Sequence, residues 1–455
     1  MTARRERNDK LAEILAESGL TYETLAKATR AIAAEAGVTV RTSRSAVHAW
    51  VASGAIPAGD TPLYVAEALS RKLRRPVTVT ELGLGQGNST ELTVAPPEAR
   101  AYDLGRLIVN NRRDFLKVAF SYTALTYPLS VITPQTAAAT LRDAGTNRRV
   151  STSEVATVRQ FTETFRAADE RLGGGHGLAV IAVFLSDVIS PMLSGTFQNS
   201  DVRRSAFEAA SAHATLVGWK CHDAGKPGPA QHFYNLAFQL ACEADPAGLA
   251  AWTMRALAHQ ALDLGHPAGT VDLAEAALAR ARGRVDRHTE ALLLITAARA
   301  HGANGNRAAA ASLIAAAQEA ASAGSCGLPF YAAAAGPTAA VVASHTGRTL
   351  TEMGDHAAAE RHYREALNER VEDTYRRGRA LTLANIGNAL AAQIRPEEAV
   401  IMWGRSLDLM GDLDSHRARQ ELNQIRATLT LYTKRKIHGA ADLDQRVSLL
   451  SAPPA

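Results

Sequence analysis

The chain has 455 residues, of which 46% are hydrophobic, 21% are charged and only 5% are aromatic, and its formal net charge is +5. This length suits two or three domains, and the alanine-rich composition favours a folded, largely helical protein over a disordered one. No window contains 18 consecutive apolar residues, which argues against a conventional membrane-spanning helix.

Three cysteines are widely spaced along the chain, at Cys221, Cys242 and Cys326, with no C-x-x-C pair. An odd number at this spacing argues against a disulfide framework and against a zinc site. We therefore expect buried thiols in a reducing compartment.

The positive charge is concentrated near the N-terminus. Residues 1–76 contain 12 Lys and Arg against 8 Asp and Glu, a balance of +4 out of the +5 of the whole chain. A basic module on a nearly neutral body favours an anionic partner for that module, although a solvated helical surface would give the same balance.

The first 77 residues carry a dense helical pattern with capping signals. Helices are predicted over residues 8–19, 21–37, 43–54 and 61–77. Thr21 and Ser43 are the expected N-caps of the second and third. The expected core positions are Leu11, Ile14, Leu15, Leu25, Ala26, Thr29, Ile32, Val47, Trp50, Leu63, Ala66, Leu69 and Leu73.

This arrangement resembles the Xre/Cro-type helix-turn-helix family. The matching residues are Leu20, Leu25 and Ala26 in the second predicted helix and SRSAVHAW, residues 43–50, in the third. The family joins these helices by a tight turn, whereas AIAAEAGVTVRTSR, residues 31–44, makes the connection longer here. The resemblance implies binding to double-stranded DNA, and the symmetry of such operators favours a homodimer.

The third predicted helix carries the side chains that we expect to read DNA. Arg44, Ser45 and His48 lie opposite Val47 and Trp50, and arginine can pair with guanine through two hydrogen bonds. The residues expected at the DNA are Arg41, Thr42, Ser43, Arg44, Ser45, His48, Lys72, Arg74 and Arg75. The alternatives are plain surface exposure for Arg44 and His48, and helix-dipole compensation for the basic cluster 71–75.

A segment in the middle of the chain is similar to an export signal. Residues 110–140, NNRRDFLKVAFSYTALTYPLSVITPQTAAAT, contain two arginines, an apolar stretch and small residues, as a twin-arginine leader does. Polar residues and a proline interrupt the apolar stretch, and a predicted helical module precedes it. We therefore expect a helix that joins the module to the body, with Phe115, Leu116, Val118 and Ala119 inward and Arg112 and Arg113 outward.

The second half of the chain is periodic. Helix-punctuating positions recur at Gly225, Gly265, Gly305, Gly354 and Arg395, mostly in steps of about forty residues. A small, a bulky and a small residue follow most of them, as in Ala230, Tyr234 and Ala237. This pattern predicts at least five stacked helical hairpins and resembles the tetratricopeptide repeat.

The expected fold class is therefore all-α, with an N-terminal helix-turn-helix module followed by a tetratricopeptide-like α-solenoid. The expected division is a helix-turn-helix domain over 1–85, a linker and connecting helix over 86–150, a repeat domain over 151–440 and a flexible tail over 441–455.

The order of segments along the chain carries a broader resemblance. The N-terminal helices, RRDFL at 112–116, GGGHGLAVIAVFLSDVISPML at 173–193 and LVGWKCHDAGKPGPAQHFYNLAFQLACEA at 216–244 resemble a large class of bacterial regulators. These join an Xre-like module to a tetratricopeptide body. The resemblance implies a cytoplasmic transcriptional regulator, not bound to membrane, whose body self-associates or senses a peptide or a small molecule.

Polar residues on the first helix of a hairpin are the candidates for an effector or partner groove. They are Lys220, His222, Arg376, Arg379, Asn385 and Asn388. Asparagine amides can bind a peptide backbone and arginine can hold a carboxylate, whereas contacts between helices are the alternative. We find no G-x-S-x-G, H-E-x-x-H or Walker motif and expect no enzyme, cofactor or metal. The competing hypothesis is a protein-interaction scaffold whose helix-turn-helix does not bind DNA.

Overall fold

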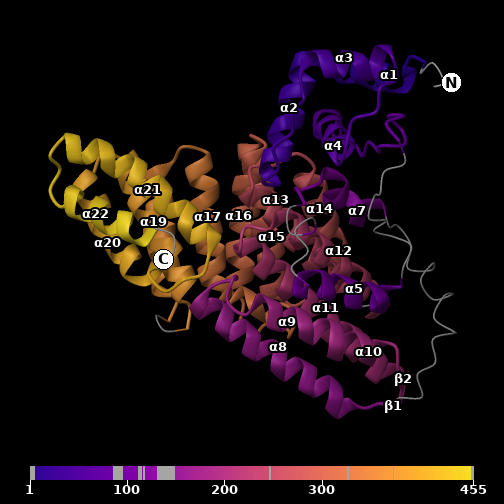
Figure 1. Cartoon of the computed structure of the whole chain (residues 1–455). Coiled ribbons are helices and arrows are strands. Elements are labelled where there is room, and N and C mark those ends of the chain that lie inside the picture. Colours follow the sequence, from indigo (N-terminus) through magenta and orange to yellow (C-terminus); the bar gives the residue numbers. More distant parts are fainter. Residues whose placement is uncertain are drawn as a thin grey trace.

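The computed structural model describes residues 6–85, 96–110, 115, 118–130, 149–244, 247–324, 327–371 and 374–451. Within these ranges the regular secondary structure is helical apart from a short parallel pair, β1 (Arg149–Val150) with β2 (Thr196–Phe197). The all-α class is confirmed. Figure 1 shows a small N-terminal module beside a larger body of paired helices. Among the described residues, no helix combines the length and apolar character needed to cross a membrane.

The N-terminal module contains α1 (Asp9–Ser18), α2 (Tyr22–Glu35), α3 (Arg44–Ala52) and α4 (Thr61–Leu73). The predicted caps set the helix starts, since the side chain of Thr21 accepts from the Thr24 N–H and that of Ser43 from the Ala46 N–H. The eight-residue segment between α2 and α3 is longer than a tight turn, as the sequence indicated.

The module has a hydrophobic core of its own, which contains most of the expected positions. Leu63 is a correction, because its side chain is 38% exposed while Tyr64 and Val65 occupy the inner face of α4. After α4 the chain turns at Arg74, with φ of 55°, and residues 77–84 return over the same core. The module therefore extends to residue 84.

The connecting region is packed into the body rather than held apart from it. It contains α5 (Pro97–Val109) and α7 (Tyr122–Ser130). The ring of Phe115 contacts those of His232 and Phe233, and Ala119 is buried, as predicted. Arg112, Arg113, Leu116 and the small residues 137–139 lie outside the described residues.

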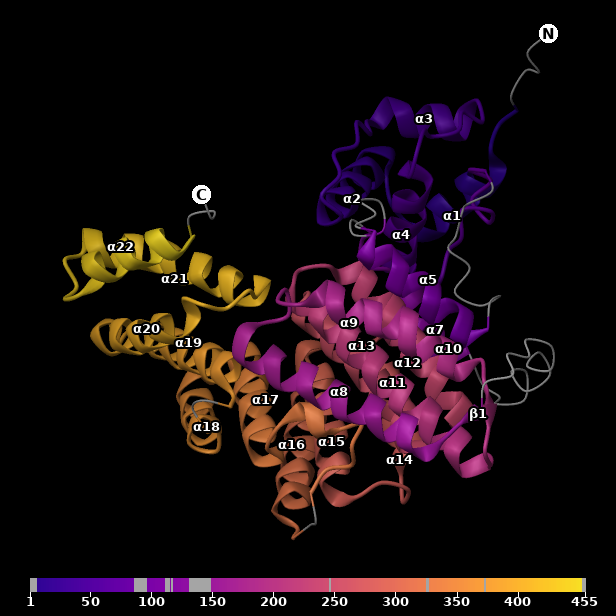
Figure 2. The same cartoon turned by 60° about the horizontal axis from the view of Figure 1, so that its bottom comes forward.

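The body begins with a long helix, α8 (Thr152–Leu172), and three short elements. These are α9 (Leu178–Phe184), a π-helical turn (Leu185–Ile189) and α10 (Ser190–Leu193). Helix α5 packs against all three short elements and against α12. Figure 2 shows α8 lying across the hairpins that follow, where it contacts α11 and α19.

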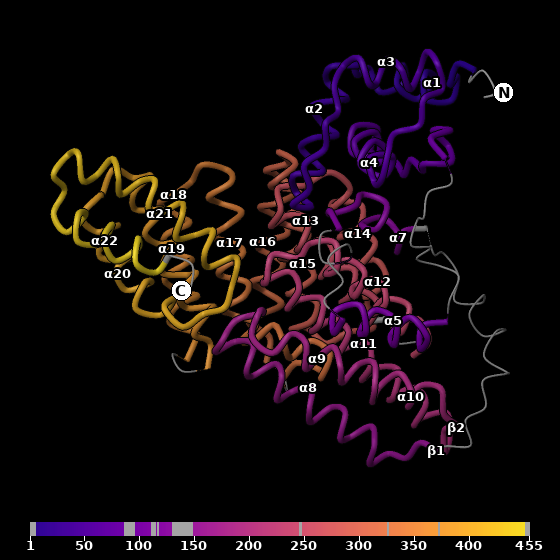
Figure 3. Tube along the Cα trace, viewed as in Figure 1, coloured from indigo at the N-terminus to yellow at the C-terminus, as the bar shows by residue number. Residues whose placement is uncertain are grey.

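Paired helices make up the rest of the body, and Figure 3 traces them in order to the C-terminus. The pairs are α11 (Ser200–Asp223) with α12 (Pro227–Ala244), α13 (Ala247–Asp263) with α14 (Thr270–Ala281), α15 (Arg287–Ala303) with α16 (Arg307–Ser322), α17 (Thr338–Glu352) with α18 (His356–Asn368), α19 (Arg376–Ala392) with α20 (Pro396–Met410), and α21 (His416–Lys434) with α22 (Ala440–Ser451). A short 3₁₀ turn, η3 (Ala333–Ala335), precedes α17.

The turns of the first, second, third and fourth pairs fall at the predicted positions, and that of the fifth falls one residue earlier. Gly225, Gly265, Gly305 and Gly354 all have positive φ, which glycine adopts without steric cost. In the fifth pair Ile394, with φ of 60°, takes this place rather than the expected Arg395.

The flexible tail predicted from residue 441 is wrong as far as residue 451. Helix α22 covers this stretch and packs against α21. Leu443 and Val447 are buried in the same core cluster as the preceding pairs, so an apolar face holds this helix in place.

The small and bulky residues of the repeat meet inside the hairpins. A Cβ on Gly218 would lie 2.7 Å from the ring of Tyr234, and one on Gly387 would lie 2.5 Å from Cδ1 and Nε1 of Trp403. The absent side chain on the first helix therefore makes room for the aromatic ring on the second. This close approach is the physical basis of the small–large pattern.

Gly387→Ala should destabilise the protein, because the added methyl group overlaps the buried Trp403 ring. We expect a loss of about 1–3 kcal/mol in the free energy of unfolding. Gly404→Ala, within α20, is the matched control. A Cβ at Gly404 would meet only a Leu443 methyl, at 3.9 Å. The control should be neutral or slightly stabilising, and denaturant titration of both variants checks this. Equal stabilities would contradict the packing argument.

Candidate functional site

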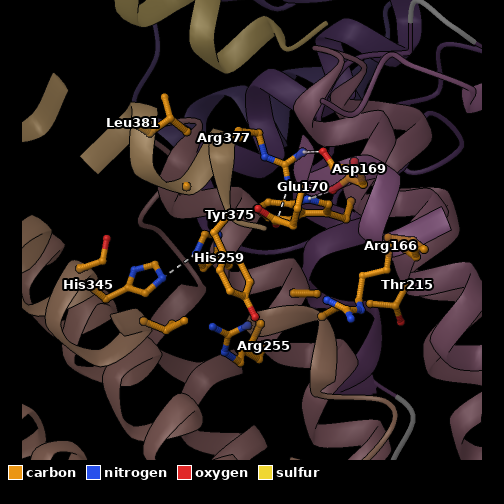
Figure 4. A pocket seen from close by; sticks show the side chains of 18 of the residues that line it. Arg166, Asp169, Glu170, Thr215, Arg255, His259, His345, Tyr375, Arg377 and Leu381 are labelled. Atoms are coloured by element: carbon orange, nitrogen blue, oxygen red, sulfur yellow. Dashed lines mark hydrogen bonds and ion pairs between the residues drawn. The ribbon is translucent and has the colours of Figure 1, made fainter. Parts of the chain in front are cut away.

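The inner helices of the body enclose a cavity of about 180 Å³. Figure 4 shows labelled side chains from α8, α11, α13, α17 and α19 converging on it. Five aromatic residues line it: Trp219, Tyr234, Trp252, Tyr331 and Tyr375. Its basic residues are Arg166, Arg255, Arg348, Arg370, Arg377 and Arg417, together with the carboxylates Asp169 and Glu170. Among the described residues, the lining is therefore positively charged.

Arg377 connects the two ends of the body across one side of the cavity. Its Nη2 donates to Asp169 Oδ2 at 2.7 Å and to Glu170 Oε1 at 2.8 Å, both at the end of α8. Its Nη1 donates to Asp223 Oδ2, at the end of α11, at 3.3 Å. The Arg377 side chain is 2% exposed, so these are buried ion pairs. They tie α19 to helices about 150–210 residues earlier in the chain.

Asp263 holds three further arginines. Its Oδ1 accepts from Arg299 at 2.6 Å and from Arg348 at 2.9 Å, and Arg417 lies 3.2 Å from its Oδ2. Burial alone would raise the pKa of Asp263, but the Arg299 guanidinium and its neighbours hold it well below the usual range. Asp263 is therefore a fixed negative charge that positions Arg348 and Arg417 in the wall.

Two buried histidines meet beside this cluster. Nε2 of His259 and Nε2 of His345 are 3.0 Å apart. Burial lowers the pKa of each well below the usual range, and nearby arginines lower the pKa of His345 further. A hydrogen bond between two such nitrogens needs one donor and one acceptor, which two neutral imidazoles supply.

Two arginines of the lining have no carboxylate within 4 Å among the described residues. Arg255 is 8% exposed, donates through Nε to the Leu292 carbonyl at 3.1 Å and lies 4.6 Å above the ring centre of Trp252. Arg370 donates through Nη1 to Thr382 Oγ1 at 2.6 Å. Burial lowers the pKa of each guanidinium to about 10. The cavity thus contains two incompletely paired donors beside flat apolar surfaces.

Only one of the predicted groove residues, Asn385, lines this cavity. Lys220 is buried with Nζ 3.4 Å from Asp169, and Nε2 of His222 lies 3.4 Å from Asp263. These two side chains hold helices together and are corrections to the predicted groove.

The other predicted groove residues also make contacts between helices. Arg376 donates to the Leu409 carbonyl and pairs with Asp412. Arg379 donates to the carbonyls of Leu367 and Arg370, and Asn388 bridges Trp403 and Glu421. The face of α19 that reaches the cavity carries Arg377, Leu381 and Asn385, spaced four apart. Arg376, Arg379 and Asn388 were therefore assigned to the wrong face and Asn385 to the right one.

On the N-terminal module, α3 lies on the side away from the body (Figures 1 and 2). Arg41, Ser43, Arg44, Ser45 and His48 are exposed along it, as predicted. Arg41 and Arg44 form no ion pair among the described residues, and the first turn of α3 contains no acidic residue. This face presents donors and positive charge to solvent.

Thr42 is a correction, because its side chain is 4% exposed and cannot reach a phosphate from this position. Its carbonyl accepts from Arg30. Trp50 is buried in the module core, as expected.

The basic cluster after α4 is divided among different contacts. Arg75 pairs with Glu17 and Glu81, while Lys72 and Arg74 are exposed. The Arg74 carbonyl accepts from the Tyr122 hydroxyl at 2.9 Å, so this end of α4 adjoins α7 rather than α3. Of these three residues, which were predicted to contact DNA, Arg75 is the one that pairs with carboxylates of the module itself.

Residues 11–85 match the family model described as the SP15 N-terminal domain. The match begins in α1 and ends one residue beyond Leu84, the last core residue of the module. It therefore covers the module and none of the body. No curated protein matches the chain.

Proposed function

We propose that the protein is a DNA-binding transcriptional regulator in which α3 reads duplex DNA. The observation that carries this proposal is the exposure of Arg44, Ser45 and His48 on α3, a helix that lies on the side of the module away from the body (Figure 1). A helix of this kind fits the major groove, and its first turn carries no acidic side chain that would repel phosphate. The resemblance of the module to the Xre/Cro family supports the same reading.

The body, on this proposal, is a tetratricopeptide-like array that controls the module. Its cavity, which arginine and aromatic side chains line, supports a role in sensing an effector. Self-association as a homodimer would match a two-fold operator. The junction between the two parts is specific: Arg71 on α4 donates to the Phe120 carbonyl at 2.7 Å, and Glu67 accepts the Tyr122 N–H at 2.9 Å. A shift of the body would therefore be transmitted to α4.

Arg44→Ala should weaken binding to a preferred DNA sequence by about 1–3 kcal/mol and relax the base preference, because a guanidinium in the major groove discriminates bases. In vitro selection with the full chain first identifies that sequence, and fluorescence anisotropy then measures affinity at several salt concentrations. Arg435→Ala, which removes the same charge from the exposed end of α21, is the matched control and should bind like the parent. Failure to enrich any sequence, or equal loss in both variants, would refute the proposal.

A second candidate function is a protein-interaction scaffold. The long segment between α2 and α3 favours it, because Val38 and Val40 pack partly against the module core and replace the tight turn of a helix-turn-helix. In that case the polar face of α3 would bind a protein, the selection would yield no DNA sequence, and Arg44→Ala would weaken a stable protein complex instead.

A further inference from the structure

The cavity in the body has an uneven distribution of charge. Arg377 is matched by three carboxylates, and Arg348 and Arg417 share Asp263. Arg255 has no carboxylate within 4 Å among the described residues. Its Nε donates to the Leu292 carbonyl, and its terminal nitrogens have no hydrogen-bond partner among those residues. A buried cation without a counter-charge is costly, so its presence at the wall of a cavity indicates an anion that enters from outside.

A second buried polar group in the lining also lacks a partner. The hydroxyl of Tyr234 has no hydrogen-bond partner among the described residues, although its side chain is 1% exposed. Tyr234 and Arg255 line the same cavity. Both groups are hydrogen-bond donors, and an unpaired donor in the lining suits an oxyanion better than a cation.

The remaining wall near Arg255 is aromatic. The Arg255 guanidinium lies over Trp252, whose ring centre is 6.4 Å from that of Tyr331, with the two ring planes tilted at 57°. An aromatic wall of this kind favours an apolar organic group rather than a hydrated inorganic ion. A cavity of about 180 Å³ suits a small molecule.

We propose that the cavity binds a small organic anion, whose oxyanion pairs with Arg255 and whose apolar part lies against the wall that Trp252 and Tyr331 form together. The inference deepens the proposed function, because it names the chemical class of the effector. Arg370 supplies additional positive charge to the same lining. In the empty protein the unpaired charge of Arg255 is destabilising, and a bound anion would offset that cost.

Calorimetry on the full chain tests the site with 2-naphthoate as the anionic probe and 2-naphthamide as its neutral counterpart. The naphthoate should bind and the amide should bind about tenfold more weakly or not at all. Arg255→Gln should reduce naphthoate affinity by about tenfold or more, and Arg255→Lys should restore part of it because it keeps the charge. Arg376→Gln, one helix face away from the lining, should have no effect.

The thermal stability of the empty proteins separates binding from a structural role. Arg255→Gln should melt at the same temperature as the parent or higher, because it removes an unpaired buried charge. No binding of naphthoate, equal binding of the amide, or undiminished binding to Arg255→Gln would overturn the proposal. So would a lower melting temperature of Arg255→Gln without any change in affinity. No DNA is present in these measurements, so they stand or fall separately from the test of α3.

Discussion

Arg377→Met should lower the free energy of unfolding by about 3–5 kcal/mol, the largest effect that we expect from any single change in the body. The guanidinium pairs with Asp169, Glu170 and Asp223 in a buried setting, and methionine fills much of its volume without its charge. Lys220 would remain 3.4 Å from Asp169. Asp223 would keep no cation within 4 Å among the described residues, which leaves a buried carboxylate uncompensated.

The neighbouring arginine is the control for this experiment. Arg376→Met removes the same group from the partly exposed face of α19, where Arg376 pairs with an Asp412 side chain that is 76% exposed. Such pairs contribute about 0–1 kcal/mol. Urea titration of both variants measures the difference. A loss below about 1 kcal/mol for Arg377→Met would show that the contact between α8, α11 and α19 does not depend on this ion-pair cluster.

Glu67→Leu should loosen the module from the body and cost roughly 2–4 kcal/mol. Both carboxylate oxygens of Glu67 lie about 3 Å from the Tyr122 N–H, at 2.9 and 3.0 Å, and Oε1 accepts from Arg71 Nε at 2.7 Å. Burial raises the pKa of Glu67, while Arg71 acts in the opposite direction. Leucine would leave the buried Tyr122 N–H unsatisfied and remove one of the two carboxylates that hold Arg71.

Hydrogen exchange at the Tyr122 amide reports on this junction directly. The amide should exchange faster in Glu67→Leu, and the α4 and α7 amides around it should lose protection. Glu17→Leu is the control, because Glu17 is half-exposed and pairs with Arg75 away from the body. It should leave exchange at Tyr122 unchanged. Unaltered exchange in Glu67→Leu would mean that other contacts suffice to dock the module.

If the module reads DNA, the same pair of variants links structure to regulation. Glu67→Leu keeps the face of α3 intact, so its intrinsic DNA affinity should be retained, while any effect of an anion in the body on that affinity should be lost. The control should keep both properties. This separates a defect in coupling from a defect in DNA contact.

Much of the fold follows from local signals in the sequence. Thr21 and Ser43 cap the helices that they were expected to cap, and four glycines with positive φ lie at the predicted hairpin turns. Caps and left-handed turns depend on a few neighbouring residues, so their physical causes can be read from a short stretch. The main local errors, Leu63 and the tail after 441, concern which apolar face is covered, and this depends on a partner helix.

The exposed face of α3 follows from local signals in the sequence, whereas the cavity depends on how helices distant in the chain pack together. Helical periodicity alone places Arg44, Ser45 and His48 opposite Val47 and Trp50. The rotation of α19, by contrast, is set by the helices that it packs against, mainly α20 and α18 with α8 and α21, and a shift of one residue turns a side chain by about 100°. That is why Arg377 rather than Arg376 lines the cavity.

The sequence by itself determined the helical class, the capped starts of α2 and α3, most of the hairpin turns and the polar face of α3, because each arises from interactions between residues close in the chain. The tertiary structure alone decided which charges are paired. Arg377 finds Asp169 across 208 positions, and Arg255 has no carboxylate within 4 Å among the described residues. Electrostatic pairing depends on distance and burial in three dimensions, and neither can be obtained from spacing along the chain.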